Sequence, residues 1–168
     1  MKKFLSISVF ALCMHTAFAQ QEITREADGT KIIKGFFTKQ ELTGDSAFAW
    51  FAQTQKGFIP KPAAVAAFKA MKDSINIIVF GGTWCGDTKQ LLPHFFSLTE
   101  AAGFPAERIT MLGVDRSKKT VQHLTEAFGI INVPTFIIMK NGKEIGRVVE
   151  YGKYGAVDRE LGEIVLRK

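Results

Sequence analysis

Two kinds of hydrophobic pattern organise the second half of the chain. Residues 75–80 and 108–114 are short apolar runs rich in β-branched side chains, which is typical of strands buried on both faces of a sheet. The segment that ends near residue 102 and residues 117–128 carry apolar positions at helical spacing. Strand, helix, strand and helix in this order predict a parallel crossover unit, and therefore an α/β fold.

The C-terminal part predicts a hairpin and a closing helix. Residues 136–139 and 144–149 are β-rich, and Asn141-Gly142 stands between them. Asn-Gly between two such runs is the strongest short signal for a β-hairpin. Residues 154–167 are then expected to form the last helix.

The segments before residue 74 predict an N-terminal extension that packs on this core. They are a turn at Asp28-Gly29, a strand over 31–37, a helical stretch to about 55 that opens with the capping box Thr38-x-x-Glu41 and breaks at Gly44-Asp45, and an alanine-rich helix from Pro60 and Pro62 to about 72. We therefore divide the chain into residues 1–19, an extension over 20–73 and a domain over 74–168. Functional groups are sparse in the extension, so we expect it to support the core.

The first nineteen residues have the features of a secretory signal peptide. Two lysines precede an apolar run over 4–12, and Ala17-Phe18-Ala19 has the small-x-small form of a cleavage site. The run is well short of the ~20 residues that a membrane span needs, and no other stretch qualifies. We expect cleavage after Ala19 and a periplasmic or secreted protein. A lipid anchor on Cys13 is the alternative, which the bulky Leu12 disfavours.

Charge and composition narrow the classes of function. Removing residues 1–19 takes away two lysines and no acid, which lowers the formal charge from +6 to +4. Basic and acidic residues are interspersed, so no nucleic-acid partner is indicated. Twelve of the fifteen phenylalanines lie after residue 19 and supply a core for one domain.

Cysteine usage points to one reactive thiol. Cys13 leaves with the predicted signal peptide, so Cys85 cannot form a disulfide within its own chain. Cys85 follows a predicted strand and begins a predicted helix, where free amide N–H groups and the helix dipole favour a thiolate. We expect the Thr88 hydroxyl, one helical turn later, to donate a hydrogen bond to the sulfur. We expect Trp84 to be half-exposed and able to contact a bound polypeptide. The alternative interpretation of Cys85 is an inert, buried cysteine.

Several elements of the sequence, in this order and spacing, resemble the thioredoxin family over about residues 74–167. They are Thr83-Trp84-Cys85-Gly86, Pro93, Asp115, Phe128-Gly129-Ile130, Val133-Pro134-Thr135 and Lys140-Asn141-Gly142-Lys143. The resemblance implies a thioredoxin fold, three layers (α/β/α) around a central mixed sheet, with a helical N-terminal extension. It also implies a cis peptide bond before Pro134, which faces Cys85, and a Val133 backbone that pairs with an extended client. More narrowly, the chain is similar to exported thioredoxin-like proteins of the Bacteroidetes type with a single-cysteine Trp-Cys-Gly-Asp-Thr site.

The departures from the family pattern all concern the second thiol. Thr88 stands where the resolving cysteine is usual, Val79 replaces the buried acid, and Met111 replaces the accompanying lysine. In that family the acid helps to deprotonate the resolving thiol, so the combined loss is coherent. We therefore predict Cys85 and Thr88 as catalytic residues. The predicted substrate-binding residues are Trp84, Gly86, Val133 and Pro134.

Other chemistries have weaker support in the sequence. His94 and His123 lack the spacing of metal ligands, and neither a metal nor another cofactor is predicted. No acid or oxyanion element accompanies them, which disfavours a Cys-His hydrolase. Peroxide reduction at Cys85 is also disfavoured, because peroxiredoxin-like sites place threonine before the cysteine.

Two functions remain open. In the first, Cys85 exchanges disulfides through a mixed disulfide with protein clients that carry cysteines or disulfides, or with a low-molecular-weight thiol. In the second, the domain binds or tethers such clients without turnover. The sequence leaves the client, the direction of electron flow and the oligomeric state open.

Overall fold

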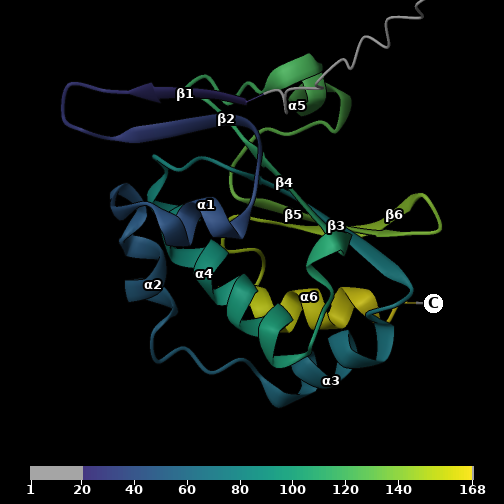
Figure 1. The fold of residues 1–168 in the computed structure, drawn as a ribbon. Coiled ribbons are helices and arrows are strands. Elements are labelled where there is room, and N and C mark those ends of the chain that lie inside the picture. The colour runs from purple at the N-terminus through teal and green to yellow at the C-terminus, as the bar shows by residue number, and fades with distance from the viewer. Residues whose placement is uncertain (1–20, 168) are drawn as a thin grey trace, which may run out of the picture.

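A six-stranded mixed sheet runs through the centre of residues 21–167, the part of the chain that this computed structural model describes (Figure 1). The predicted signal peptide over 1–19 lies outside the described residues. The strands are β1 (Gln21–Arg25), β2 (Lys31–Phe37), β3 (Ile75–Gly81), β4 (Ile109–Gly113), β5 (Thr135–Lys140) and β6 (Lys143–Val149). Their order in the sheet is β1-β2-β4-β3-β5-β6, with β3 and β4 parallel and the other neighbouring pairs antiparallel.

Helices cover the two faces of the sheet unequally. The α-helices are α1 (Lys39–Gly44), α2 (Trp50–Gln55), α3 (Pro62–Met71), α4 (Gly86–Ala101), α5 (Leu124–Ala127) and α6 (Val157–Val165), and short 3-10 turns occupy Ser46–Phe48, Ala106–Arg108 and Val121–His123. Helices α2, α3, α4 and α6 lie on one side of the sheet, and the short α5 lies on the other (Figure 1). This arrangement confirms the predicted α/β fold with a central mixed sheet.

Two hydrophobic clusters follow from the alternation of side chains along β3. Val79 points into the larger cluster beneath the main helices, where Phe68 and Phe95 are completely buried. The next residue, Phe80, points into a smaller cluster on the opposite face, against Ile137. Both faces of β3 are therefore buried, as its continuous apolar run predicts.

Most predicted elements are present at the expected places. The strand over 31–37 is confirmed, and the helical stretch after Thr38 breaks at Gly44-Asp45 as expected. At its start the Thr38 amide donates a 2.7 Å hydrogen bond to the Glu41 carboxylate. The hairpin between β5 and β6 turns at Asn141 and Gly142, both with positive φ.

The predicted helix over 117–128 is wrong for most of its length. Only residues 124–127 form α5, because the Asp115 carboxylate accepts hydrogen bonds from the Ser117 and Lys119 amides at 2.9 and 3.0 Å. Those amides are turned toward a side chain, which competes with the helical pattern. Lys118, Gln122 and His123 also adopt left-handed backbone angles, which no continuous helix allows.

Two smaller expectations also need correction. The last helix begins at Val157, because the chain turns through Gly152 and Gly155 at positive φ before it. Strand β1 was not predicted, since its sequence is polar and four of its five residues are exposed. Within residues 21–167, every helix is too short or too polar to cross a bilayer.

Gly113 lets the N-terminal hairpin approach the rest of the sheet. Strand β2 pairs with β4 from Gly35 opposite Gly113 to Phe37 opposite Met111. A Cβ atom on Gly113 would lie only 2.2 Å from the Ile33 carbonyl oxygen. A side chain at this position therefore requires β2 to move away.

We expect Gly113→Ala to lower the free energy of unfolding by about 3 kcal/mol, the upper part of the range for overpacking a buried site. The reason is that the added methyl group meets backbone, which has no other rotamer to adopt. Urea unfolding measures the change. Gly44→Ala is the control, because a Cβ there meets nothing within 4 Å. Equal stability of the two variants would show that β2 does not pack this closely.

Candidate functional site

Cys85 lies where the sequence predicts it, between the end of β3 and the start of α4. It is the N-cap residue of α4 and is partly exposed. Its amide donates a 2.8 Å hydrogen bond to the Gly82 carbonyl, and its own carbonyl accepts one from Lys89 at 3.0 Å. The first turn of α4 thus presents free amides and the positive end of the helix dipole beside the sulfur.

The predicted substrate-binding residues Val133 and Pro134 lie beside this thiol. The Cys85 Sγ atom donates a hydrogen bond to the Val133 carbonyl oxygen at 3.3 Å, and the peptide bond between Val133 and Pro134 is cis. The Glu150 amide donates a 2.7 Å hydrogen bond to the Pro134 carbonyl, which places the end of β6 at the same site. Three segments that are distant in sequence therefore meet around Val133 and Pro134, and the sulfur contacts the first of these residues.

The Thr88 side chain is buried and turned toward the preceding loop. Its Oγ1 accepts a 3.2 Å hydrogen bond from the Gly82 amide, and its exposed fraction is 0%. The expected hydrogen bond to Cys85 is absent from the contacts within residues 21–167, because the hydroxyl oxygen is aligned with Gly82. The Thr88 methyl group also packs on Gly81, where a Cβ would lie 3.1 Å away. Thr88 braces the turn, and its catalytic role stays a prediction.

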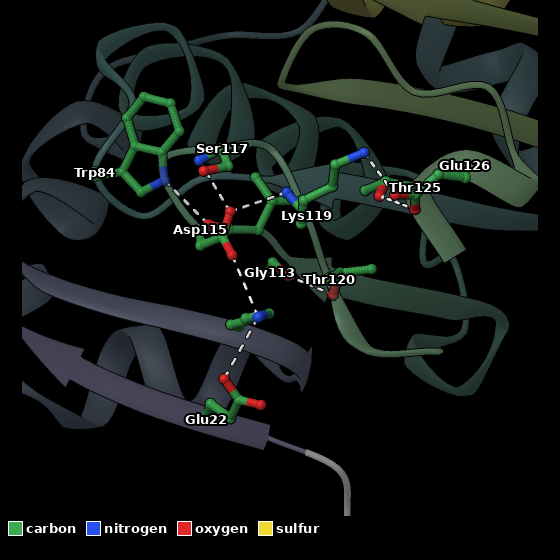
Figure 2. A network of polar contacts seen from close by, with 11 residues as sticks. Glu22, Trp84, Gly113, Asp115, Ser117, Lys119, Thr120, Thr125 and Glu126 are labelled. Atoms are coloured by element: carbon green, nitrogen blue, oxygen red, sulfur yellow. Dashed lines mark hydrogen bonds and ion pairs between the residues drawn. The ribbon is translucent and has the colours of Figure 1, made fainter. Parts of the chain in front are cut away.

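Trp84 is half-buried, as expected, and its indole is restrained in the turn. The ring nitrogen donates a 3.0 Å hydrogen bond to the Val114 carbonyl at the end of β4 (Figure 2). Gly82 packs against the ring so closely that a Cβ there would lie 2.8 Å from it. The Arg116 guanidinium lies over the ring, 5.0 Å from its centroid. The exposed Gly86 follows as the first residue of α4.

The structure adds residues to the site that sequence reasoning missed. The Thr83 hydroxyl donates to the Lys31 carbonyl at 2.8 Å and accepts from the Ile33 amide at 3.2 Å, which connects the turn to β2. Arg116 contacts Trp84 from the loop after β4. The family motif includes Thr83 without giving it a role and does not include Arg116, since each residue acts through a partner far along the chain.

Tyr151, in the turn after β6, is another missed residue. Burial raises the pKa of its phenol above the ordinary value, and the negative charges of Asp87 and Cys85 raise it further. Asp87 belongs to the first turn of α4. No local sequence signal relates Tyr151 to Asp87.

The positions of the missing acid and lysine are filled by apolar packing. Val79 on β3 and Met111 on β4 are register neighbours, and both are buried in the larger hydrophobic cluster. The space that a charged pair would occupy in a dithiol site is therefore part of the core.

His94 and His123 lie outside this arrangement. His94 stacks on Phe58 with ring centroids 3.8 Å apart, and burial lowers its pKa. His123 has a left-handed backbone before α5. Among the described residues, no three or more His, Cys, Asp or Glu side chains gather as a metal site.

Comparisons with known proteins agree on one family. The family model described as Thioredoxin matches residues 63–161. Thioredoxin of Chlamydia muridarum is 37% identical over 80 residues, which cover 48% of this chain and 72% of that protein. Thioredoxin of Alicyclobacillus acidocaldarius is 28% identical over 95 residues, 55% of this chain and 84% of that protein. A crystal structure of an HIV epitope scaffold aligns with a TM-score of 0.51 at 14% identity, covering 74% of this chain and 86% of that one, and supports the fold alone.

We expect Thr88→Val to lower the free energy of unfolding by about 1–3 kcal/mol, because it leaves the buried Gly82 amide without its acceptor. Thr88→Ser keeps the oxygen and loses one methyl group, which costs about 0.8 kcal/mol. Urea unfolding of both variants measures the difference. A valine variant as stable as the unsubstituted chain would show that the Gly82 amide does not depend on Thr88.

We expect Asp87→Asn to shift the pKa of Tyr151 downward, toward the ordinary tyrosine value, because one of the negative charges that favour the neutral phenol is removed. Tyrosinate absorbance during an alkaline titration reports the shift in a Tyr154→Phe background, where Tyr151 is the only tyrosine. Because folding raises the pKa of Tyr151, its contribution to the free energy of unfolding is complete below the ordinary tyrosine pKa. This contribution is lost as the pH rises through the raised pKa. The exposed Asp73→Asn is the control, and equal shifts in both variants would contradict the assignment.

Proposed function

The chain belongs to the thioredoxin family, and from this membership we propose that it performs thiol–disulfide exchange through Cys85 alone. A thiol–disulfide redox role is what the family supports in general. The observation that carries the finer proposal is the pairing of a partly exposed Cys85 sulfur with a buried Thr88. The sulfur lies 3.3 Å from the Val133 carbonyl, while Thr88 fills the position of a second thiol.

The exchange proceeds in two balanced steps. The Cys85 thiol donates a hydrogen bond to the Val133 carbonyl before the reaction. In the first step it gives up its proton to solvent or to a base. The thiolate attacks one sulfur of a client disulfide, so that a bond to Cys85 forms, the client S–S bond breaks, and the other sulfur leaves as a thiolate with the electron pair. A second thiol, from the client or from a low-molecular-weight compound, then loses its proton and attacks the client sulfur of the mixed disulfide. A new S–S bond forms to the client sulfur, the bond to Cys85 breaks, and Cys85 leaves as a thiolate with the electron pair.

The single thiol limits the net reaction. An isolated Cys85 cannot form an internal disulfide, so the protein alone cannot supply the two electrons that reduce a client disulfide to a dithiol. Isomerisation of disulfides, or exchange of a small thiol on a client, is consistent with this limit. Neither reaction requires a cofactor.

The other predicted residues have binding roles in this proposal. The first amides of α4, beginning with Gly86, lie at the end of the helix where the dipole favours negative charge. Trp84 supplies apolar contact to the client, and the backbone at Val133 and Pro134 pairs with an extended client segment. The proposed partners are proteins that carry cysteines or disulfides.

The second candidate function is tethering of clients without turnover. It is favoured by the same observation, because a mixed disulfide at Cys85 has no second cysteine within residues 21–167 to release it. The two functions differ in the fate of the mixed disulfide. Release by an added thiol indicates exchange, and persistence indicates tethering.

The cellular setting is part of the proposal. The features of residues 1–19 support export to the periplasm or beyond, with an extension over 20–73 and the thioredoxin-like domain over 74–168. The Trp-Cys-Gly-Asp-Thr element supports membership in the single-cysteine Bacteroidetes-type group. An oxidising compartment supplies the disulfides on which Cys85 would act.

We expect the chain from residue 20 onward, which contains every described element, to form an adduct with one glutathione per Cys85 when it is mixed with glutathione disulfide. Mass spectrometry detects the adduct, and Cys85→Ala forms none. Thr88→Cys is expected to shed the glutathione without added thiol, because the new thiol closes an internal disulfide.

Added reduced glutathione separates the two candidate functions. If reduced glutathione releases Cys85 from the adduct faster than it reduces a small-molecule mixed disulfide, exchange is supported. If the adduct persists, tethering is supported. A chain that forms no adduct at all would contradict both.

A further inference from the structure

We propose that the hairpin of β1 and β2 is a working part of the Cys85 site, and that Glu26 and Arg116 are positioning residues that orient Trp84 toward the client. This inference rests on the proposed exchange function. It assigns a role to the N-terminal extension beyond support of the core.

The first observation is a two-point ion pair between the hairpin and the loop after β4. Arg116 Nε and Nη2 donate to the two carboxylate oxygens of Glu26 at 2.9 and 2.5 Å. This contact lowers the pKa of Glu26 and raises the pKa of Arg116, so both groups are charged across the neutral pH range. A bidentate pair fixes the plane of the guanidinium as well as its position.

The second observation is what the fixed guanidinium touches. Its central carbon lies 5.0 Å from the centroid of the Trp84 ring, a favourable cation–π distance. Trp84 precedes Cys85 directly and is half-buried, so its remaining surface is available to a client. The hydrogen bond to Val114 fixes one edge of the indole, and Arg116 restrains the face.

The third observation is that the hairpin also contacts both loops beside Cys85. Thr83 in the turn before α4 is bonded to the β2 backbone at Lys31 and Ile33. In the loop after β4, the Asp115 carboxylate lies 3.3 Å from Lys34 Nζ, which also approaches Glu22 of β1 at 3.5 Å (Figure 2). Among the contacts within residues 21–167, the pair of Glu26 with Arg116 connects the hairpin to the face of the Trp84 ring.

These contacts predict how Glu26 affects the reaction. When the charge of Glu26 is removed, Arg116 loses its ion pair and no longer restrains the Trp84 ring. The ring then samples more orientations, and a client that binds must pay the entropic cost of ordering it. A small aromatic disulfide reaches the sulfur without needing the ring. Exchange with a polypeptide should therefore weaken while exchange with the small disulfide changes little.

The test uses the chain from residue 20 onward with Trp50→Phe, which leaves Trp84 as the only tryptophan. Glu26→Gln and Arg116→Gln are expected to increase acrylamide quenching of Trp84 fluorescence. We expect them to slow exchange with a glutathionylated peptide by about two- to fivefold, the worth of an exposed cation–π contact. The rate with dithionitrobenzoate, a small aromatic disulfide, should change little.

Two further variants serve as controls. Glu22→Gln removes a carboxylate from the same hairpin that contacts Lys34 and not Arg116, so it should behave like the unsubstituted chain. Arg116→Lys keeps a cation and loses the bidentate contact, and it should restore part of the peptide rate.

The outcomes separate this inference from the function on which it rests. If Glu26→Gln matches Glu22→Gln in quenching and in peptide rate, the inference is wrong even though the chain is active. Equal loss of rate with both disulfides would also overturn it, because the effect would then lie on Cys85 itself. If the unsubstituted chain reacts with neither disulfide, the exchange function is wrong, and the quenching result still decides whether the hairpin restrains Trp84.

Discussion

The site depends on a tight turn between β3 and α4 that is closed through Gly82. The Gly82 carbonyl accepts the Cys85 amide at 2.8 Å, and the Gly82 amide donates to the Thr88 hydroxyl at 3.2 Å. Both backbone groups of one residue are thus used to place the thiol at the helix N-terminus. The absence of a Cβ on Gly82 gives the Trp84 ring its position. Loss of this turn would move the sulfur, the ring and the helix start together.

Much of the fold follows from local patterns in the sequence, because burial on both faces leaves a continuous apolar run and a hairpin leaves Asn-Gly. The start of α4 and the place of Cys85 follow from the same kind of signal. The loop after β4 could not be predicted in this way, since its conformation is decided by hydrogen bonds from the Asp115 carboxylate to nearby amides. The Thr88 hydroxyl was also misplaced, because helical spacing gives the direction of a side chain and not the best partner within its reach. Proline makes a cis bond before residue 134 accessible, and the choice of cis over trans was implied by the resemblance alone.

The departures from the family pattern form one consistent packing solution. Val79 and Met111 are neighbours across β3 and β4, and both lie in the apolar core. An acid returned to position 79 alone would be buried without a partner, which is costly. The core beneath the site and the single thiol above it are therefore matched to each other.

The bonds of Thr83 to β2 connect residues that are 50 and 52 positions apart in the chain. We expect such non-local contacts to form after local ones, because a long loop must close before they contribute. A chain that has paired β3 with β4 but has not yet docked its first hairpin would carry a cysteine without an ordered environment. The Cys85 site is therefore complete only when the N-terminal hairpin has docked on the sheet, so a reactive, ordered thiol is restricted to the fully folded protein.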